Sequence, residues 1–223
     1  MRISVSYLVL LAHVVCGNIR AGAQHMHGSE RIAELQKKLA GHKDDTEKVD
    51  LLNEISYAYN KINPYEGIKY GTQSLSLAEE LQWRKGAARA NSCLGANYFS
   101  LSDFLNAFNY WHRAVKINEE LGNKTGVANN QHNIGNIYFS QKNYPEALKY
   151  YESGLKTGKE SGNKQLVTNS YSSIGNVYTQ MKDYSKALEY HFNALAIDEE
   201  LGLKSNVASV QTDIGNVYNE QGN

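Results

Sequence analysis

The chain has 223 residues, with 23 Lys or Arg and 23 Asp or Glu, so its formal net charge at pH 7 is zero. A balanced charge argues against partners that need a basic surface, such as DNA, RNA or an anionic membrane. Only two prolines occur, and Ala, Leu, Lys and Glu are plentiful, which favours helix. The two cysteines are Cys16 and Cys93. Because Cys16 lies in a segment expected to be removed, no internal disulfide is predicted.

Residues 1–23 are predicted to be a cleavable signal peptide. Arg2 supplies a positive start, Ile3 to Val15 form an apolar run too short to span a bilayer, and Ala21-Gly22-Ala23 offers small residues for cleavage after Ala23. A lipoprotein signal at Cys16 is the less favoured alternative, because Val15 stands where such signals have a small residue. The protein is therefore expected to be secreted or periplasmic.

Residues 24–44 are expected to form a leader and an N-terminal capping helix. His25 and His27 are two potential metal ligands, but a defined site needs three or four, so no metal site is predicted. Ile32, Leu35 and Leu39 have helical spacing and would cap the structure that follows.

A repeat of 40 residues organises the rest of the chain. Ile134-Gly135-Asn136 recurs as Ile174-Gly175-Asn176 and as Ile214-Gly215-Asn216, after an earlier copy at Leu94-Gly95-Ala96. Three other columns keep the same step: Tyr98, Tyr138, Tyr178 and Tyr218; Ala107, Ala147 and Ala187; Gly122, Gly162 and Gly202. Independent columns that share one period indicate a repeat protein.

The period divides the chain into a degenerate unit at 45–83, units at 84–123, 124–163 and 164–203, and the first helix of an incomplete unit at 204–223. Each unit reads as two helices, for example about 124–141 and 144–161. Gly122, Gly162 and Gly202 are expected to close the second helices in left-handed conformation. Because the chain stops inside a unit, we expect a longer protein, with Ile214, Val217 and Tyr218 lacking their usual cover.

Small and large residues alternate in a way that predicts close packing between helices. Gly135 costs about 1 kcal/mol of helix propensity relative to alanine, which close approach of a neighbouring helix would offset. Ala147 and Ala187 are expected to do the same on the second helix. Tyr138 and Tyr178 are expected to fill the space beside these small residues.

Gly135, Tyr138, Ala147 and Tyr151 resemble the signature of the tetratricopeptide repeat (TPR) family. The flanking repeats show it as Gly175, Tyr178, Ala187 and Ala194, and as Gly95, Tyr98, Ala107, Trp111 and Ala114. The usual unit has 34 residues, and the step of 40 is similar to LGN-type and kinesin-light-chain-type arrays. With the signal peptide, the chain resembles the N-terminal sensor part of Bacteroidetes TPR signalling proteins. The resemblance implies an all-α fold, a right-handed α-solenoid of stacked antiparallel helix hairpins.

Polar residues recur on the first helices, which line the inner surface of a solenoid. An amide carries both a donor and an acceptor, so it can pair with a peptide backbone in either direction. We therefore predict peptide binding by a set of residues on these helices: Asn129, His132, Asn136, Asn169, Ser172, Asn176, Thr212 and Asn216. The alternative is that the asparagines bond to neighbouring helices and only stabilise the stack.

Sequence motifs of enzymes are absent: there is no phosphate-binding loop, zinc motif or nucleophile elbow. No catalytic residue or cofactor is predicted. The chain is expected to be a non-catalytic scaffold for a peptide or partner protein, without nucleic-acid or membrane contact beyond the signal peptide. An alternative is the extracytoplasmic sensory region of a larger membrane signalling protein, with a histidine kinase, nucleotide cyclase or transcriptional regulator as output. A third is self-association through the incomplete last unit.

Overall fold

The computed structural model describes residues 28–222, so the predicted signal peptide, His25 and His27 lie outside the described range. Within that range the chain is helical and contains no strand. A first helix covers residues 28–39, and it is followed by α2 (Thr46–Tyr59), α3 (Pro64–Glu80), α4 (Arg84–Ser100), α5 (Phe104–Glu120), α6 (Lys124–Ser140), α7 (Tyr144–Ser161), α8 (Lys164–Gln180), α9 (Tyr184–Glu200) and α10 (Lys204–Gln221). None of the described helices is long and apolar enough to cross a bilayer.

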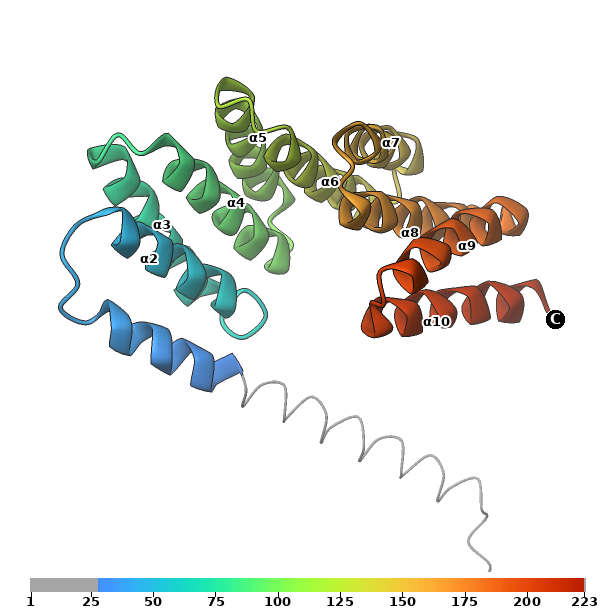
Figure 1. Ribbon diagram of the computed structural model, residues 1–223, viewed down its shortest axis with the longest axis horizontal. Helices are drawn as coiled ribbons and strands as arrows, with labels where there is room; N and C mark the ends of the chain where they lie inside the picture. Colours follow the sequence, from blue (N-terminus) through green and yellow to red (C-terminus); the bar gives the residue numbers. More distant parts are fainter. Residues whose placement is uncertain (1–27, 223) are drawn as a thin grey trace, which may run out of the picture.

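The helices form hairpins that stack along an arc (Figure 1). Each helix packs against the next in sequence, and α4, α6, α8 and α10 also contact one another in turn. These four first helices begin at Arg84, Lys124, Lys164 and Lys204, which confirms the predicted step of 40 residues. In Figure 1, α5 and α7 lie on the outer side of the arc, and α4, α6 and α8 lie nearer its inner side.

The corners between helices share one backbone geometry. Gly122, Gly162 and Gly202 have φ of 65°, 66° and 66°, as expected for left-handed residues that close the second helices. The following N–H then returns to the last turn; the N–H of Asn123 donates to the Asn118 carbonyl at 2.8 Å. The corners inside the hairpins α4–α5, α6–α7 and α8–α9 adopt the same conformation without glycine, with φ of 59° at Ser102 and Lys142 and 61° at Lys182. No glycine marks these strained positions in the sequence.

Polar residues at the corners cap the helices that follow. The Asp103 and Asp183 carboxylates accept from the N–H groups of Asn106 and Lys186, three residues later. Asn143 stands at the same position before α7, but its side chain forms no such bond. Pro145 follows in the first turn and lacks one of the two N–H groups from which this cap could accept.

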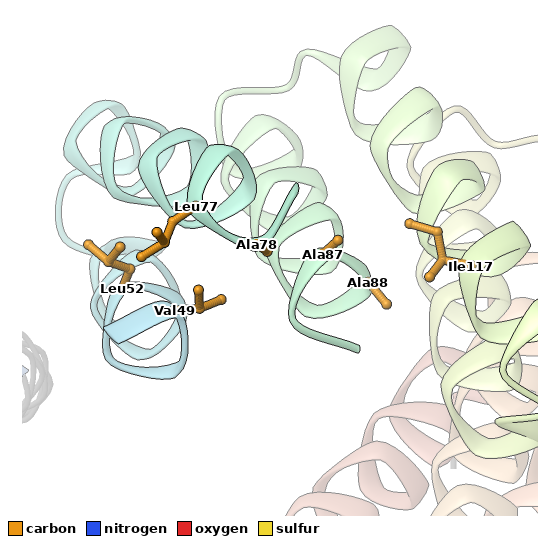
Figure 2. Packing of buried hydrophobic residues seen from close by; sticks show 7 residues of the cluster. All are labelled: Val49, Leu52, Leu77, Ala78, Ala87, Ala88 and Ile117. Carbon is orange, nitrogen blue, oxygen red and sulfur yellow. The ribbon is translucent and has the colours of Figure 1, made fainter. Parts of the chain in front are cut away.

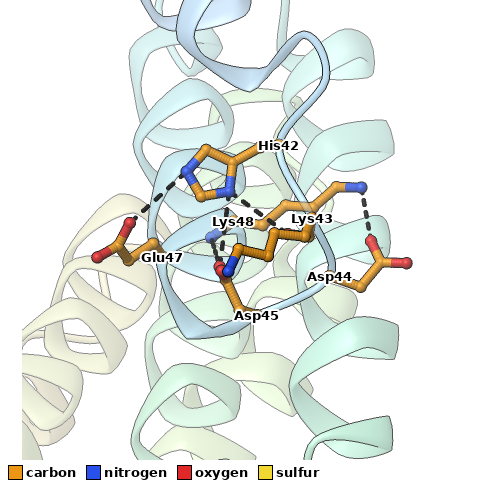
Figure 3. Close-up of polar contacts among 6 residues, drawn as sticks. All are labelled: His42, Lys43, Asp44, Asp45, Glu47 and Lys48. Atoms are coloured by element: carbon orange, nitrogen blue, oxygen red, sulfur yellow. Dashed lines mark hydrogen bonds and ion pairs between the residues drawn. The ribbon is translucent and has the colours of Figure 1, made fainter.

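The first helix covers the N-terminal end of the array as predicted, because Ile32 and Leu35 are buried. Its junction with α2 is polar, as Figure 3 shows. Asp45 accepts from the Lys48 N–H at 3.0 Å and caps α2, while the His42 ring lies 3.6 Å from carboxylate oxygens of Asp45 and Glu47. These contacts set where α2 begins.

The core runs between the hairpins as a series of small clusters. Figure 2 shows the first of them, in which side chains from α2, α3, α4 and α5 meet: Val49, Leu52, Leu77, Ala78, Ala87, Ala88 and Ile117. Further along, Ala107, Ala147 and Ala187 are completely buried, which confirms close helix approach at this column.

The large residue that fills the space beside each helical glycine comes from the second helix of the same hairpin. A β-carbon built on Gly95, Gly135 or Gly175 would lie 2.5 to 2.7 Å from the ring of Trp111, Tyr151 or His191, respectively. The expectation that Tyr138 fills the space beside Gly135 is therefore wrong, although Tyr138 does pack against the cluster that contains Ala147. Tyr138 instead stacks on Tyr150, with ring centroids 5.5 Å apart. Glycine is required at Gly95, Gly135 and Gly175 because any side chain there would meet a buried ring.

The last helix is better covered than its sequence suggested. Ile214 is buried and Val217 is completely buried, because α8 and α9 already shield this face. Only Tyr218, with 40% of its surface exposed, fits the expectation of missing cover. A β-carbon on Gly215 would meet nothing within 4 Å, unlike those on Gly135 and Gly175.

Candidate functional site

The inner surface of the arc contains hollows between successive first helices. One hollow of about 390 Å³, the N-terminal hollow, lies between α4 and α6. Two more, of about 300 and about 320 Å³, share Asn176 and Asp213 and are called the C-terminal groove. The groove is lined mainly by α8 and α10, with residues from α6 and α9: His132, Phe139, Thr168, Asn169, Ser172, Ser173, Asn176, Thr179, Gln180, Asp198, Asn206, Ser209, Val210, Asp213, Asn216, Asn219 and Glu220.

The C-terminal groove brings together most of the predicted peptide-binding residues. His132, Asn169, Ser172 and Asn176 line the first of its two hollows, and Asn176 and Asn216 line the second. Asn169 and Asn176 lie two helical turns apart, so about 10 Å of helix axis separates their amides. Three of the predicted asparagines therefore lie on the surface of one groove between α8 and α10: Asn169, Asn176 and Asn216.

Three predicted residues lie elsewhere. Asn129 is exposed in the N-terminal hollow, whereas Asn136 and Thr212 line none of these hollows. The Asn136 amide oxygen accepts from the Tyr151 hydroxyl at 2.7 Å, and Thr212 donates to the Ala208 carbonyl at 2.8 Å. Burial raises the pKa of Tyr151, so its hydroxyl remains a neutral donor. For Asn136 the alternative role, a bond that stabilises the stack, fits the geometry better.

His132 forms part of the groove wall and packs on a buried ring. Its centroid lies 4.9 Å from that of Tyr151, and its Nε2 lies 3.4 Å from the Ser173 hydroxyl. Its Nδ1 is buried without a hydrogen-bond partner among the described residues. Burial lowers the pKa of His132 to about 4, so the imidazole is neutral at pH 7 and adds no positive charge to the groove.

The charges of the C-terminal groove are all negative. Asp198, Asp213 and Glu220 line it, and no Lys or Arg does. Asp198 on α9 is 1% exposed and accepts from the Asn206 amide at 3.4 Å. Burial raises the pKa of Asp213, which indicates a carboxylate poorly compensated by its surroundings. Sequence reasoning missed these acids because it followed residues that recur, and none of the three recurs.

The N-terminal hollow differs in its charge. Arg89 on α4 pairs with Asp50 at 2.9 Å and with Glu54 at 3.8 Å, so acids and base compensate each other within the protein. Asn130 is also engaged, donating to the Gly126 carbonyl and accepting from Ser92. Arg89, Asp50 and Asn130 of this hollow therefore already have partners within the protein.

Other reactive groups do not form a second site in the described range. No group of three or more His, Cys, Asp or Glu side chains is placed there to hold a metal ion. Cys93 is buried, and burial raises the pKa of its thiol to about 12. The thiol is therefore protonated and unreactive at neutral pH.

Helical hairpins stacked in an arc, with a polar groove along the inner helices, define the class of α-solenoid repeat proteins. Residues 86–160 and residues 168–201 each match the tetratricopeptide repeat family. The chain belongs to that family, as its repeated glycine, tyrosine and alanine columns predicted.

Solved structures show the same fold at low sequence identity. BtubC (BKLC) from P. vanneervenii is 21% identical with a TM-score of 0.69, over 90% of this chain and 84% of that protein. A signal transduction ATPase (STAND protein) with a tetratricopeptide repeat sensor, from Pyrococcus horikoshii, is 19% identical with a TM-score of 0.72, over 88% of this chain and 31% of that protein.

A Rap protein complexed with Competence and Sporulation Factor is 16% identical with a TM-score of 0.75, over 88% of this chain and 61% of that protein. No curated protein matches the chain. At these identities, the similarity to solved structures establishes the fold alone.

Proposed function

We propose that this protein is a non-catalytic interaction scaffold whose C-terminal groove binds an extended segment of a partner protein. The proposal rests on two side-chain amides that lack hydrogen-bond partners within the described part of the chain. Asn176 and Asn216 line adjoining hollows, and neither side chain has a hydrogen bond to the described part of the chain. Each therefore has a free donor and a free acceptor that match a peptide backbone.

The dimensions of the groove suit an extended segment. Asn169 and Asn176 are separated by about 10 Å along α8, which equals about three residues of an extended strand. The Rap structure, solved with Competence and Sporulation Factor, supports the idea that this architecture can hold a partner. A net hydrogen bond contributes about 0.5–1.5 kcal/mol, so two amides together account for about tenfold in affinity or more.

The test is a pull-down from cell-envelope extract with the purified protein and an Asn176→Ala/Asn216→Ala variant. We expect the unaltered protein to retain a partner that the variant loses, while circular dichroism shows the same helix content in both. Asn136→Ala is the matched control, because it removes an asparagine from the same column that bonds to Tyr151. The control should bind the partner and be less stable. Equal retention by the protein and the double variant would contradict the proposal.

We also propose that the array works outside the cytoplasm, on the strength of the N-terminal sequence alone. A fusion of residues 1–30 to alkaline phosphatase lacking its own signal should be exported and active. Leu10→Arg interrupts the apolar run and should abolish that activity. Equal activity of the two fusions, or none in either, would count against the proposal.

A second candidate function is a sensory region within a larger signalling protein. The Pyrococcus horikoshii protein, in which a tetratricopeptide repeat sensor is joined to a STAND ATPase, favours it as a precedent. We expect the gene to continue beyond Asn223 into a membrane helix and an output domain. A stop codon directly after Asn223 in the intact gene would exclude this candidate.

A further inference from the structure

The repeats allow each residue of the last units to be compared with its equivalents 40 residues earlier. Asp213 stands where the preceding units have Cys93, Asn133 and Ser173. At the column of Asp198 they have Ala78, Asn118 and Gly158, and at the column of Glu220 they have Ser100, Ser140 and Gln180. Three columns that are uncharged elsewhere thus become acidic in the last two units.

The fold places these three departures in one groove. Asp198 comes from α9, Asp213 and Glu220 from α10, and all three line the C-terminal groove. Stacking does not require them, because the same columns pack with neutral residues in the earlier hairpins. The acids are therefore best explained by what the groove binds.

Asp198 points most directly to a missing cation. It is 1% exposed, yet it lines the groove, and within residues 28–222 it forms no ion pair. Its hydrogen bond from Asn206 is 3.4 Å long, and the buried Nδ1 of His132 in the same hollow has no partner. A buried carboxylate is costly unless a positive group compensates it.

The N-terminal hollow shows how the same protein compensates such charges internally. There, Arg89 bonds to Asp50 and lies close to Glu54. The equivalent of Arg89 beside Asp213 is Ser209, which cannot neutralise a carboxylate. No Lys or Arg of the described chain lines the C-terminal groove, so the positive charge that compensates its acids would come from the ligand.

We propose that the C-terminal groove selects partner segments that carry a lysine or arginine, whose cationic group binds between Asp198 and Asp213. This inference rests on the proposed function, in which Asn176 and Asn216 hold the backbone of the same segment. Glu220, which lines the second hollow of the groove, adds electrostatic attraction for the same cationic segment. Charge-assisted hydrogen bonds to carboxylates are stronger than neutral ones, so the basic residue acts as the anchor.

The test is selection of random twelve-residue peptides displayed on phage against the immobilised protein. We expect enriched peptides to share a lysine or arginine. A synthetic peptide of the enriched sequence should bind at least tenfold more weakly when that residue is replaced by norleucine or glutamine, and more weakly at high salt.

The variants use residues that the chain itself places at the equivalent columns, which protects the fold. Asp198→Asn follows Asn118, and Asp213→Asn follows Asn133. The double variant should bind the basic peptide at least tenfold more weakly. Glu199→Gln removes the same charge from an exposed position outside the groove and should bind like the unaltered protein. Circular dichroism monitors folding of each variant.

The outcomes separate this inference from the proposed function. Peptides enriched without a basic residue, or basic peptides that bind the double variant as tightly as the unaltered protein, would overturn the charge selection and leave peptide binding intact. Failure to enrich any peptide, together with a negative pull-down, would overturn both. Loss of binding that is equally severe in Glu199→Gln would show a nonspecific charge effect and overturn the inference.

Discussion

The buried face and the inner face of the same helices follow opposite rules. On the buried face, the glycine that meets a ring recurs at Gly95, Gly135 and Gly175, and the tightly packed alanine recurs at Ala107, Ala147 and Ala187. On the inner face, one column changes from Cys93 to Asn133, Ser173 and Asp213. In this protein, the recurring glycines and alanines stack the hairpins, whereas the acids that line the C-terminal groove are departures from the repeat.

The difference has an energetic origin. A stacking residue must fit a neighbour whose shape is itself repeated, so each unit tolerates only a narrow range of side chains. A groove residue borders open space and is constrained only by the ligand. Changes on the buried face should therefore affect stability, whereas changes in the groove should affect binding.

The largest expected loss of stability follows Trp111→Ala on the buried face. Trp111 is 2% exposed, packs against Gly95 and donates to the Ser92 carbonyl at 3.1 Å. Removing a buried indole costs about 3–5 kcal/mol, which urea unfolding followed by circular dichroism would measure. Asn176→Ala in the groove should change the free energy of unfolding by less than about 0.5 kcal/mol. Comparable losses in the two variants would break the distinction between the faces.

Acid should destabilise the protein through His191, which is completely buried on the stacking face. Burial lowers the pKa of His191 to about 4, below the 6.5 of an exposed histidine. The neutral ring therefore contributes stability that is fully present above pH 6.5 and is lost as the pH falls towards 4, by between about 2 and 3 kcal/mol at pH 4.5.

His191→Tyr, which places there the residue found at Tyr151, should flatten the dependence of unfolding free energy on pH. His132, whose pKa is lowered in the same way at the groove wall, contributes to the pH dependence in the same direction. An unchanged pH profile in His191→Tyr would show that the buried ring is not the titrating group.

A smaller effect is expected from adding one methyl group to helical glycines. Gly135→Ala brings a β-carbon to 2.7 Å from the Tyr151 ring, whereas Gly215→Ala meets nothing within 4 Å. Overpacking costs about 1–3 kcal/mol, so Gly135→Ala should be destabilising. Gly215→Ala should be stabilising by up to about 1 kcal/mol through helix propensity. The same sign for both variants in urea unfolding would contradict the assigned contact.

The smallest change concerns the corners. Lys182 has φ of 61° in a position where an L-residue is strained, so Lys182→Gly should stabilise the protein by about 0.5 kcal/mol. Gly202→Ala, at a corner with φ of 66° and open space around the β-carbon, should destabilise it by about 1 kcal/mol. If backbone strain determines the stability of these corners, thermal unfolding should show a raised midpoint temperature for Lys182→Gly and a lowered one for Gly202→Ala.

The sequence alone determined the helix pairs, the step of 40 residues and the left-handed closures at Gly122, Gly162 and Gly202. These features depend on local chemistry and on a period that one chain displays several times. It also identified the columns of the groove, because every third or fourth residue of a helix shares one face.

Only the tertiary structure decided which residues in those columns are free to act. Asn136 and Asn176 are equivalent in sequence, yet Asn136 accepts from Tyr151, whereas the residue equivalent to Tyr151 in the next unit is His191, which forms no such bond. The ring beside Gly135 and the lining of one hollow by both Asp198 and Asp213 likewise depend on side chains from different helices. Such contacts are long-range, so the periodicity that fixes each helix carries no information about them.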